Sequence, residues 1–156
     1  MQRSSQYPTP MHTISGSGVD TAWVRHYGSG LIPSADAAVA VAVDASGNVY
    51  VTGYSYGSGT SYDYATIKYT SAGDTAWVRR YNGPGNSWDE ATALAVDASR
   101  NVYVTGKSYG SGTDRDYATI KYTSAGDMAW VRRYNGPGNI YDVAHALLLM
   151  RAGMCM

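Results

Sequence analysis

The residues best placed to do chemistry form two copies of an Asp-x-Ser-x-Asn pattern. The copies are Asp44, Ser46 and Asn48, and then Asp97, Ser99 and Asn101. Oxygen side chains at alternate positions open a calcium loop, but Ser55 and Ser108 stand where an EF-hand loop has its last glutamate. Short polar side chains also bond their own backbone in hairpin turns. We therefore expect two Asx-type turns without a metal, and calcium binding is the alternative.

Charged side chains recur in two further places. Asp63 and Asp116 precede predicted strands, and two arginine pairs follow on later strands; the pairs are Arg79 and Arg80, and Arg132 and Arg133. Such charges usually lie in solvent on an outer strand and discourage edge-to-edge pairing. We expect that role here, and recognition of an acidic ligand is the alternative.

Tyrosine is abundant, with 15 copies and no phenylalanine in the chain. Eleven of them lie in or beside predicted strands: Tyr50, Tyr56, Tyr62, Tyr64, Tyr69, Tyr81, Tyr103, Tyr109, Tyr117, Tyr122 and Tyr134. Their strand positions predict packing between neighbouring sheets for most of them. A sugar- or protein-binding surface is the alternative.

Signs of catalysis are weak. His12, His26 and His145 have no metal-ligand spacing, and the chain has neither a Gly-x-Ser-x-Gly elbow nor a phosphate loop. The single cysteine, Cys155, has no nearby base in the sequence. We expect no catalytic residue and no cofactor.

The charge balance and the apolar content of the chain limit the kinds of partner it can bind. Lys and Arg together number 12, and so do Asp and Glu, so no net charge favours nucleic acid. No apolar run is long enough for a membrane-spanning helix, which predicts no membrane insertion. The first 12 residues lack the apolar stretch of a secretory signal, so we expect none in this sequence.

The elements that position these residues belong to a repeat of 53 residues. Residues 44–86 and 97–139 differ at five of 43 positions. The differing pairs are Gly47/Arg100, Tyr54/Lys107, Ser61/Asp114, Tyr62/Arg115 and Thr75/Met128. A fixed period of this size indicates a solenoid, a propeller or an array.

Each unit reads as four short strands separated by turns. In the first unit they are the Ala/Val run at 38–43, the alternating stretches at 49–52 and 64–69, and the Trp-containing stretch at 76–81. The Ala/Val run predicts an innermost strand covered on both faces. No helical period occurs. Four antiparallel strands in about 50 residues match one propeller blade, so we expect an all-β, partial β-propeller.

The stretches DASGNVYVTG, DYATIKYTSAGD and AWVRRYNG resemble the bacterial seven-bladed propeller repeat (SBBP), from about residue 20 to residue 147. Arg100 departs from the pattern, because the first copy has the turn glycine Gly47 there, and we expect a slightly strained turn. The resemblance implies an extracellular or cell-surface propeller without catalytic residues.

Taken in order, the chain predicts an irregular segment at 1–19, an outer strand and linker at 20–35, and blades at 36–88 and 89–141. An inner strand of a third blade begins at 142, and the stretch ends in a tail that stops resembling the repeat. A coding sequence for DASGNVYVT read one base later gives MRAGMCM and a stop codon. We therefore interpret residues 150–156 as an out-of-frame reading of the next unit.

Propellers typically close with four to eight blades, so two and a fraction leave open faces. The possible outcomes are a poorly soluble fragment, a short open stack, or a ring closed by several copies, and we expect the fragment. The partners would be other blades or copies of the chain, with a protein or glycan also possible. The predicted function is a non-catalytic structural or interaction module, and the alternative is a propeller that binds calcium or a glycan.

Overall fold

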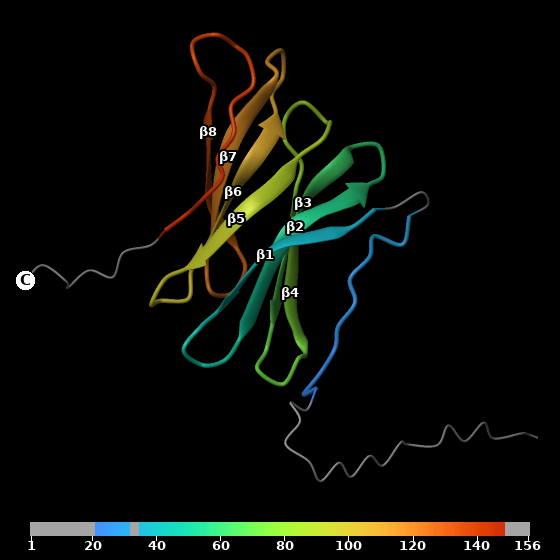
Figure 1. Ribbon diagram of the computed structural model, residues 1–156, viewed down its shortest axis with the longest axis vertical. Helices are drawn as coiled ribbons and strands as arrows, with labels where there is room; N and C mark the ends of the chain where they lie inside the picture. The colour runs from blue at the N-terminus through green and yellow to red at the C-terminus, as the bar shows by residue number, and fades with distance from the viewer. Residues whose placement is uncertain (1–20, 32–34, 149–156) are drawn as a thin grey trace, which may run out of the picture.

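The computed structural model describes residues 21–31 and 35–148, which contain strands and no helix. They form two four-stranded antiparallel sheets that lie face to face (Figure 1). The first blade has the order β1(Ala37–Val43), β2(Val49–Gly57), β3(Ser61–Tyr69), β4(Thr75–Tyr81). The second has the order β5(Glu90–Val96), β6(Val102–Tyr109), β7(Arg115–Tyr122), β8(Met128–Tyr134). The prediction of an all-β partial propeller is therefore confirmed.

A glycine and a bulge fix how each inner strand joins its sheet. The pairing of β1 with β2 shifts between Ala38 and Ala40, and β5 shifts at the same place in the second blade. Opposite the bulge lies Gly53, where a Cβ atom would come within 1.8 Å of the Ala37 carbonyl oxygen. Gly106 meets the Glu90 carbonyl oxygen in the same way, at 2.1 Å. The glycine that ends the Val-Tyr-Val-Thr-Gly motif is thus required by the close approach of the inner strand.

Hydrophobic packing joins the blades. Tyr50, Tyr64 and Trp77 of the first blade pack against valine, isoleucine and tyrosine side chains of the second. These partners are Val102, Val104, Ile120 and Tyr122, each at most 1% exposed. Tyr64 also donates a hydrogen bond to the Ala118 carbonyl across the interface. The prediction that tyrosines pack between sheets is confirmed for these rings.

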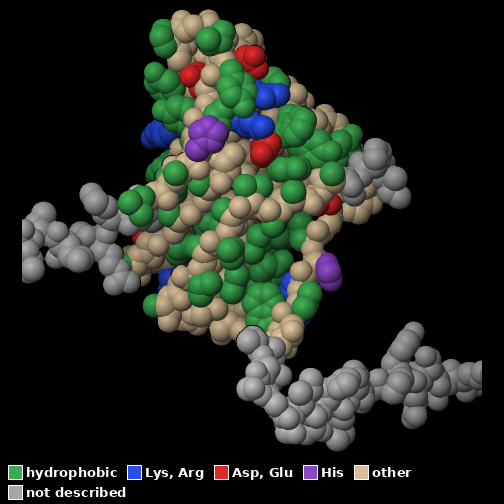
Figure 2. Space-filling view, viewed as in Figure 1, with side chains coloured by type: hydrophobic (Ala, Val, Ile, Leu, Met, Phe, Trp, Pro, Cys, Tyr) green, Lys and Arg blue, Asp and Glu red, His purple; other side chains and the backbone are tan. Residues whose placement is uncertain are grey.

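The first inner strand corrects one expectation. β1 was predicted to be covered on both faces, yet Val41 is 66% and Val43 62% exposed. Their counterparts in β5, Leu94 and Val96, are half-buried because β5 lies against the first blade. In the described part of the chain no blade stands in front of β1, and Figure 2 shows hydrophobic side chains at the surface over the first sheet.

One turn carries the strain predicted from the repeat. Gly47 has a φ of 77°, in the left-handed region, and Arg100 occupies the same place in the second blade with a φ of 65°. A side chain with a Cβ atom is disfavoured there by about 1–2 kcal/mol. The only other non-glycine residues with positive φ in the described ranges are Ser61, Asn86 and Asn139.

A short segment covers part of each outer face. Residues 22–27 lie on the first blade, where the Trp23 indole donates to the Ser71 carbonyl. Residues 142–148 lie on the second blade, where the Asp142 amide donates to the Arg115 carbonyl. The interpretation of 150–156 as an out-of-frame tail lies outside the described residues, as does His12. Among the described residues no helix could cross a membrane.

Candidate functional site

The two Asp-x-Ser-x-Asn stretches are hairpin turns closed by their own aspartates. Asp44 Oδ1 accepts the backbone N–H groups of Ser46 and Asn48, at 2.9 and 3.0 Å. Its Oδ2 accepts the Asn48 side-chain amide at 2.8 Å and the Tyr50 hydroxyl at 3.0 Å. Asp97 accepts equivalent bonds from Asn101 and Tyr103. The single carboxylate of Asp44 thus accepts hydrogen bonds from four donors, which is the geometry of an Asx turn.

These bonds set the acidity of the turn. Burial acts to raise the pKa of Asp44, but the bonds from Asn48, Tyr50 and Ser46 outweigh it and hold the pKa below its usual 3.8. The pKa of Asp97 is lowered for the same reasons. Burial, the hydrogen bond to Asp44 and the charge of that carboxylate together raise the pKa of Tyr50 to about 12. The turn aspartates are therefore ionised, and Tyr50 is a neutral donor, at physiological pH.

The predicted solvent-facing charges are partly buried, which corrects that expectation. Asp63 and Asp116 are each 5% exposed. Arg80 donates to Asp63 Oδ2 at 2.9 Å and to the Ser55 hydroxyl at 2.7 Å. The second blade repeats this pattern with Arg133, Asp116 and Ser108.

The physical reason is strand alternation. Successive side chains of a strand point to opposite faces of its sheet. One arginine of each pair, Arg80 or Arg133, therefore reaches the buried aspartate and serine, and its neighbour points to the other face. Arg79 instead donates to the Gly126 carbonyl of the second blade, and the equivalent Arg132 is exposed. The guanidinium of each inward arginine is held ionised, since hydrogen bonds to its neighbours raise its pKa against the effect of burial. We assign Arg80 and Arg133 a structural role.

A third aspartate position escaped sequence reasoning. Asp89 is fully buried between the linker and the second blade. Its Oδ2 accepts the Gly83 amide at 2.5 Å and its Oδ1 accepts the Tyr109 amide at 3.0 Å. Burial raises its pKa above 3.8 even though these amides and the Ser108 hydroxyl act to lower it. Asp89 thus fastens the end of one blade to the next.

The same contact occurs at both outer faces. Asp36 accepts the Ser29 and Tyr56 amides, and Asp142 accepts the Gly136 amide. An aspartate just before each inner strand is the signal that could have revealed this clamp in the sequence. It was missed because an isolated aspartate near a linker resembles ordinary turn chemistry.

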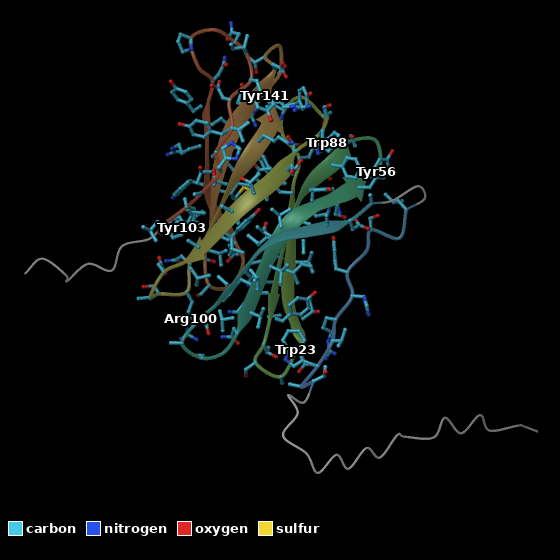
Figure 3. All side chains as sticks on the ribbon, in the orientation of Figure 1. Trp23, Tyr56, Trp88, Arg100, Tyr103 and Tyr141 are labelled. Atoms are coloured by element: carbon cyan, nitrogen blue, oxygen red, sulfur yellow. The ribbon has the colours of Figure 1, made fainter. Side chains whose placement is uncertain are left out.

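An aromatic and cationic surface lies at the β2–β3 and β6–β7 hairpin end of the blades. This hairpin-end surface comprises Tyr54, Tyr56, Tyr62, Trp88, Lys107, Tyr109, Arg115 and Tyr141. Trp88 lies 5.1 Å from the Tyr62 ring centre, and Lys107 stands 5.4 Å from the Trp88 ring centre while pairing with Glu90 at 2.7 Å. Figure 3 shows Tyr56, Trp88 and Tyr141 along this end and Arg100 near the other.

Three of the five differences between the repeats fall on this end. Tyr54 becomes Lys107, Tyr62 becomes Arg115, and Ser61 becomes Asp114. Around Trp88 the first blade therefore supplies aromatic rings, while Arg115 of the second lies over the rings of Tyr109 and Tyr141. Three of the differences between the copies thus lie where side chains reach the hairpin end, and the other two, Gly47/Arg100 and Thr75/Met128, lie outside it.

The remaining candidates are not brought together. His26 and His145 are exposed, and the described residues contain no group of three or more His, Cys, Asp or Glu side chains that could hold a metal. Cys155 lies outside the described residues. The features that the structure does assemble are the two aspartate turns, the aspartate clamp and the aromatic hairpin-end surface.

Comparison with known proteins agrees with this architecture. A search of curated proteins finds no match to the chain. The family model of the beta-propeller repeat SBBP matches residues 22–59 and 76–112. Each match runs from an outer-strand position, through the linker and clamp aspartate, into the first two strands of the following blade. The chain therefore contains two beta-propeller repeats of the SBBP type.

Proposed function

We propose that the chain is a non-catalytic structural and interaction module, a pair of propeller blades that packs against further blades through its outer faces. The observation that carries this proposal is an inequality between equivalent residues. Tyr50 and Tyr64 are fully buried between the blades, while their counterparts Tyr103 and Tyr117 are only half-buried on the outer face. The outer face of the second blade thus carries the same apolar residues that the first blade buries against its neighbour. Such a face fits a further blade of the same type.

The location follows from the resemblance alone. The sequence resembles an extracellular propeller repeat, and we propose that this module acts outside the cytoplasm. A fusion to a reporter that is active on only one side of the membrane tests the location; activity confined to the cytoplasm would contradict it.

The packing proposal is tested by light scattering on purified protein over a range of concentration. We expect association that weakens when Val41, which is 66% exposed on β1, is replaced by Asp. Thr75→Asp is the matched control, because Thr75 is exposed at the start of β4, away from the inner strand. A monomer that stays monomeric at high concentration and ignores Val41→Asp would overturn the proposal.

A second candidate function is glycan binding at the hairpin-end surface. It is favoured by the clustering of differences between the two repeats there, since ligand contacts vary where packing contacts do not. Trp88 is 37% exposed, and an aromatic ring beside a lysine is suited to stacking on a sugar face. Saturation-transfer NMR against an oligosaccharide panel, with Trp88→Ala and Trp130→Ala compared, tests it. A signal that survives only in Trp130→Ala supports the site; one that survives in both variants contradicts it.

A further inference from the structure

Residues 22–27 cover the first blade as the outer strand β4 covers the second. The Trp23 indole donates to the Ser71 carbonyl at 3.3 Å, and the Trp77 indole donates to the Ser124 carbonyl at 3.4 Å. Each indole ring also lies over the glycine of the same turn, Trp23 over Gly73 and Trp77 over Gly126. A Cβ atom on Gly73 would come within 2.6 Å of the Trp23 ring.

The neighbouring contacts repeat as well. Trp23 lies 5.7 Å from the Tyr69 ring centre with the planes at 42°, and Trp77 lies 6.1 Å from Tyr122 at the same angle. Arg80 donates to the Tyr27 hydroxyl at 3.4 Å, as Arg133 does to the Tyr81 hydroxyl at 3.1 Å. Residues 22–27 therefore hold the position of an outer strand belonging to a blade that would precede the first.

Two features distinguish this segment from β4. Within the described residues it has no backbone hydrogen bonds to a neighbouring strand, whereas β4 pairs with β3 along its length. Between the segment and the first sheet lies a cavity of about 310 Å³, lined by Trp23, Tyr27, Val51, Ile67 and Tyr69 among others. At the equivalent place in the second blade the space is filled by Tyr50 and Tyr64.

We propose that this face is an acceptor for a three-stranded β-meander of the same repeat type, supplied by a partner chain. The third strand of the meander pairs antiparallel with residues 22–27 and completes a four-stranded blade. Its two tyrosines, at the positions of Tyr50 and Tyr64, enter the cavity, and the second donates its hydroxyl to the Ala65 carbonyl as Tyr64 does to Ala118. The inference rests on the proposed function of the chain as a blade-packing module.

The geometry favours this occupant over a whole blade. A complete blade, such as the second blade of another copy, brings its own outer strand with Trp130 at the position of Trp77. That strand would have to displace residues 22–27, so a whole blade packs on this face more weakly than a meander without its outer strand. A meander that lacks its outer strand has no such conflict, and it can pair with the edge of the segment beside which no other described strand lies.

The test uses the full chain and two probes fused to a soluble carrier protein. The short probe carries residues 89–124, which include β5 to β7, and the long probe carries residues 89–136, which add β8. We expect the short probe to bind at least tenfold more tightly than the long one. Replacing Tyr103 and Tyr117 by Ala in the short probe should weaken binding at least tenfold while leaving the full chain untouched.

A variant pair on the acceptor completes the test. Trp23→Ala should weaken binding of the short probe at least tenfold, while Val24→Ala should not, because Val24 is 59% exposed on the same segment and does not line the cavity. Equal or tighter binding of the long probe would overturn strand donation but leave the packing function standing. Binding by neither probe to a chain that circular dichroism shows to be folded would overturn both.

Discussion

The clamp made by Asp89 offers the sharpest test of how the blades are joined. Replacing it with Ala removes the acceptor of two amide groups, those of Gly83 and Tyr109, at 2.5 and 3.0 Å from its oxygens. The side chain is fully buried, so water cannot readily take its place. A buried donor left without a partner costs about 1–3 kcal/mol. Two such donors, less the desolvation that the carboxylate no longer suffers, give a loss of about 3 kcal/mol.

The chain contains its own controls for this change. Asp36 accepts the Ser29 and Tyr56 amides at longer distances, 3.1 and 3.2 Å, and it is only half-buried. Asp142 is half-buried as well and accepts the Gly136 amide. Solvent can satisfy the freed amides at both outer positions, so alanine there should cost about 1 kcal/mol. The Asp36 and Asp89 variants each lose an acceptor of two amides and differ mainly in burial, while the Asp142 variant loses an acceptor of one.

Urea unfolding of dilute protein, followed by tryptophan fluorescence, measures the three losses. Trp77 lies at the interface between the blades and should report its separation. A loss of about 3 kcal/mol is a large part of the 5–15 kcal/mol typical of a domain. If Asp36→Ala and Asp89→Ala cost the same, or if Asp89→Ala costs less than 1 kcal/mol, the burial argument is refuted.

Four further outcomes follow from the turns and strands. Gly106→Ala should lower the free energy of unfolding by more than about 3 kcal/mol, because its Cβ would strike the backbone of the inner strand. Gly112→Ala has open space around it at a φ of 83°, so it should cost only about 1 kcal/mol. Urea unfolding of both variants compares the two losses. Arg100→Gly should add up to about 1 kcal/mol by relieving a positive φ, and a lower melting temperature would contradict that. The lowered pKa values of Asp44 and Asp97 give stability that is present above pH 3.8 and lost as the pH falls through the folded values. The double variant to Asn should therefore melt lower than the parent at pH 6 and equally at the acid end, in a thermal scan at each pH. Excess calcium should leave the melting temperature of the parent unchanged, because the turn donors already occupy these carboxylates; a calcium-dependent rise abolished in the double variant would show a metal site.

Local chemistry explains why the strands could be predicted from the sequence. Alternating residues at 49–52 and turn residues at 44–48 act over a few positions, and the structure places β2 and its preceding turn there. The repeat then required the second blade to match the first. The turn strain at Arg100 was also predictable, since glycine at the same place in the other copy marks a backbone that favours positive φ.

Side-chain partners far apart in the sequence could not be predicted in the same way. Whether Arg79 or Arg80 faces the buried Asp63 depends on the register of β3 with β4, which shifts by a bulge between Lys68 and Tyr69. Neither composition nor spacing reveals that bulge. The exposure of Val41 was missed for a related reason, because burial of an inner strand depends on the blade in front of it and not on the strand's own residues.

The positions of the two covering segments limit what can complete the outer blades. Residues 22–27 hold the place of the outer strand of a blade that would precede the first, and residues 142–148 hold the place of the inner strand of a blade that would follow the second, as the Asp142 contacts show. If two copies met end to end, these segments would supply the outer and inner strands of one shared blade, but neither would supply its two central strands. The central strands carry the tyrosines that fill the interface in the intact pair, here Tyr50 and Tyr64. A partner that brings central strands is therefore required for a complete blade at this junction, and association between copies of the described region alone would leave its core open.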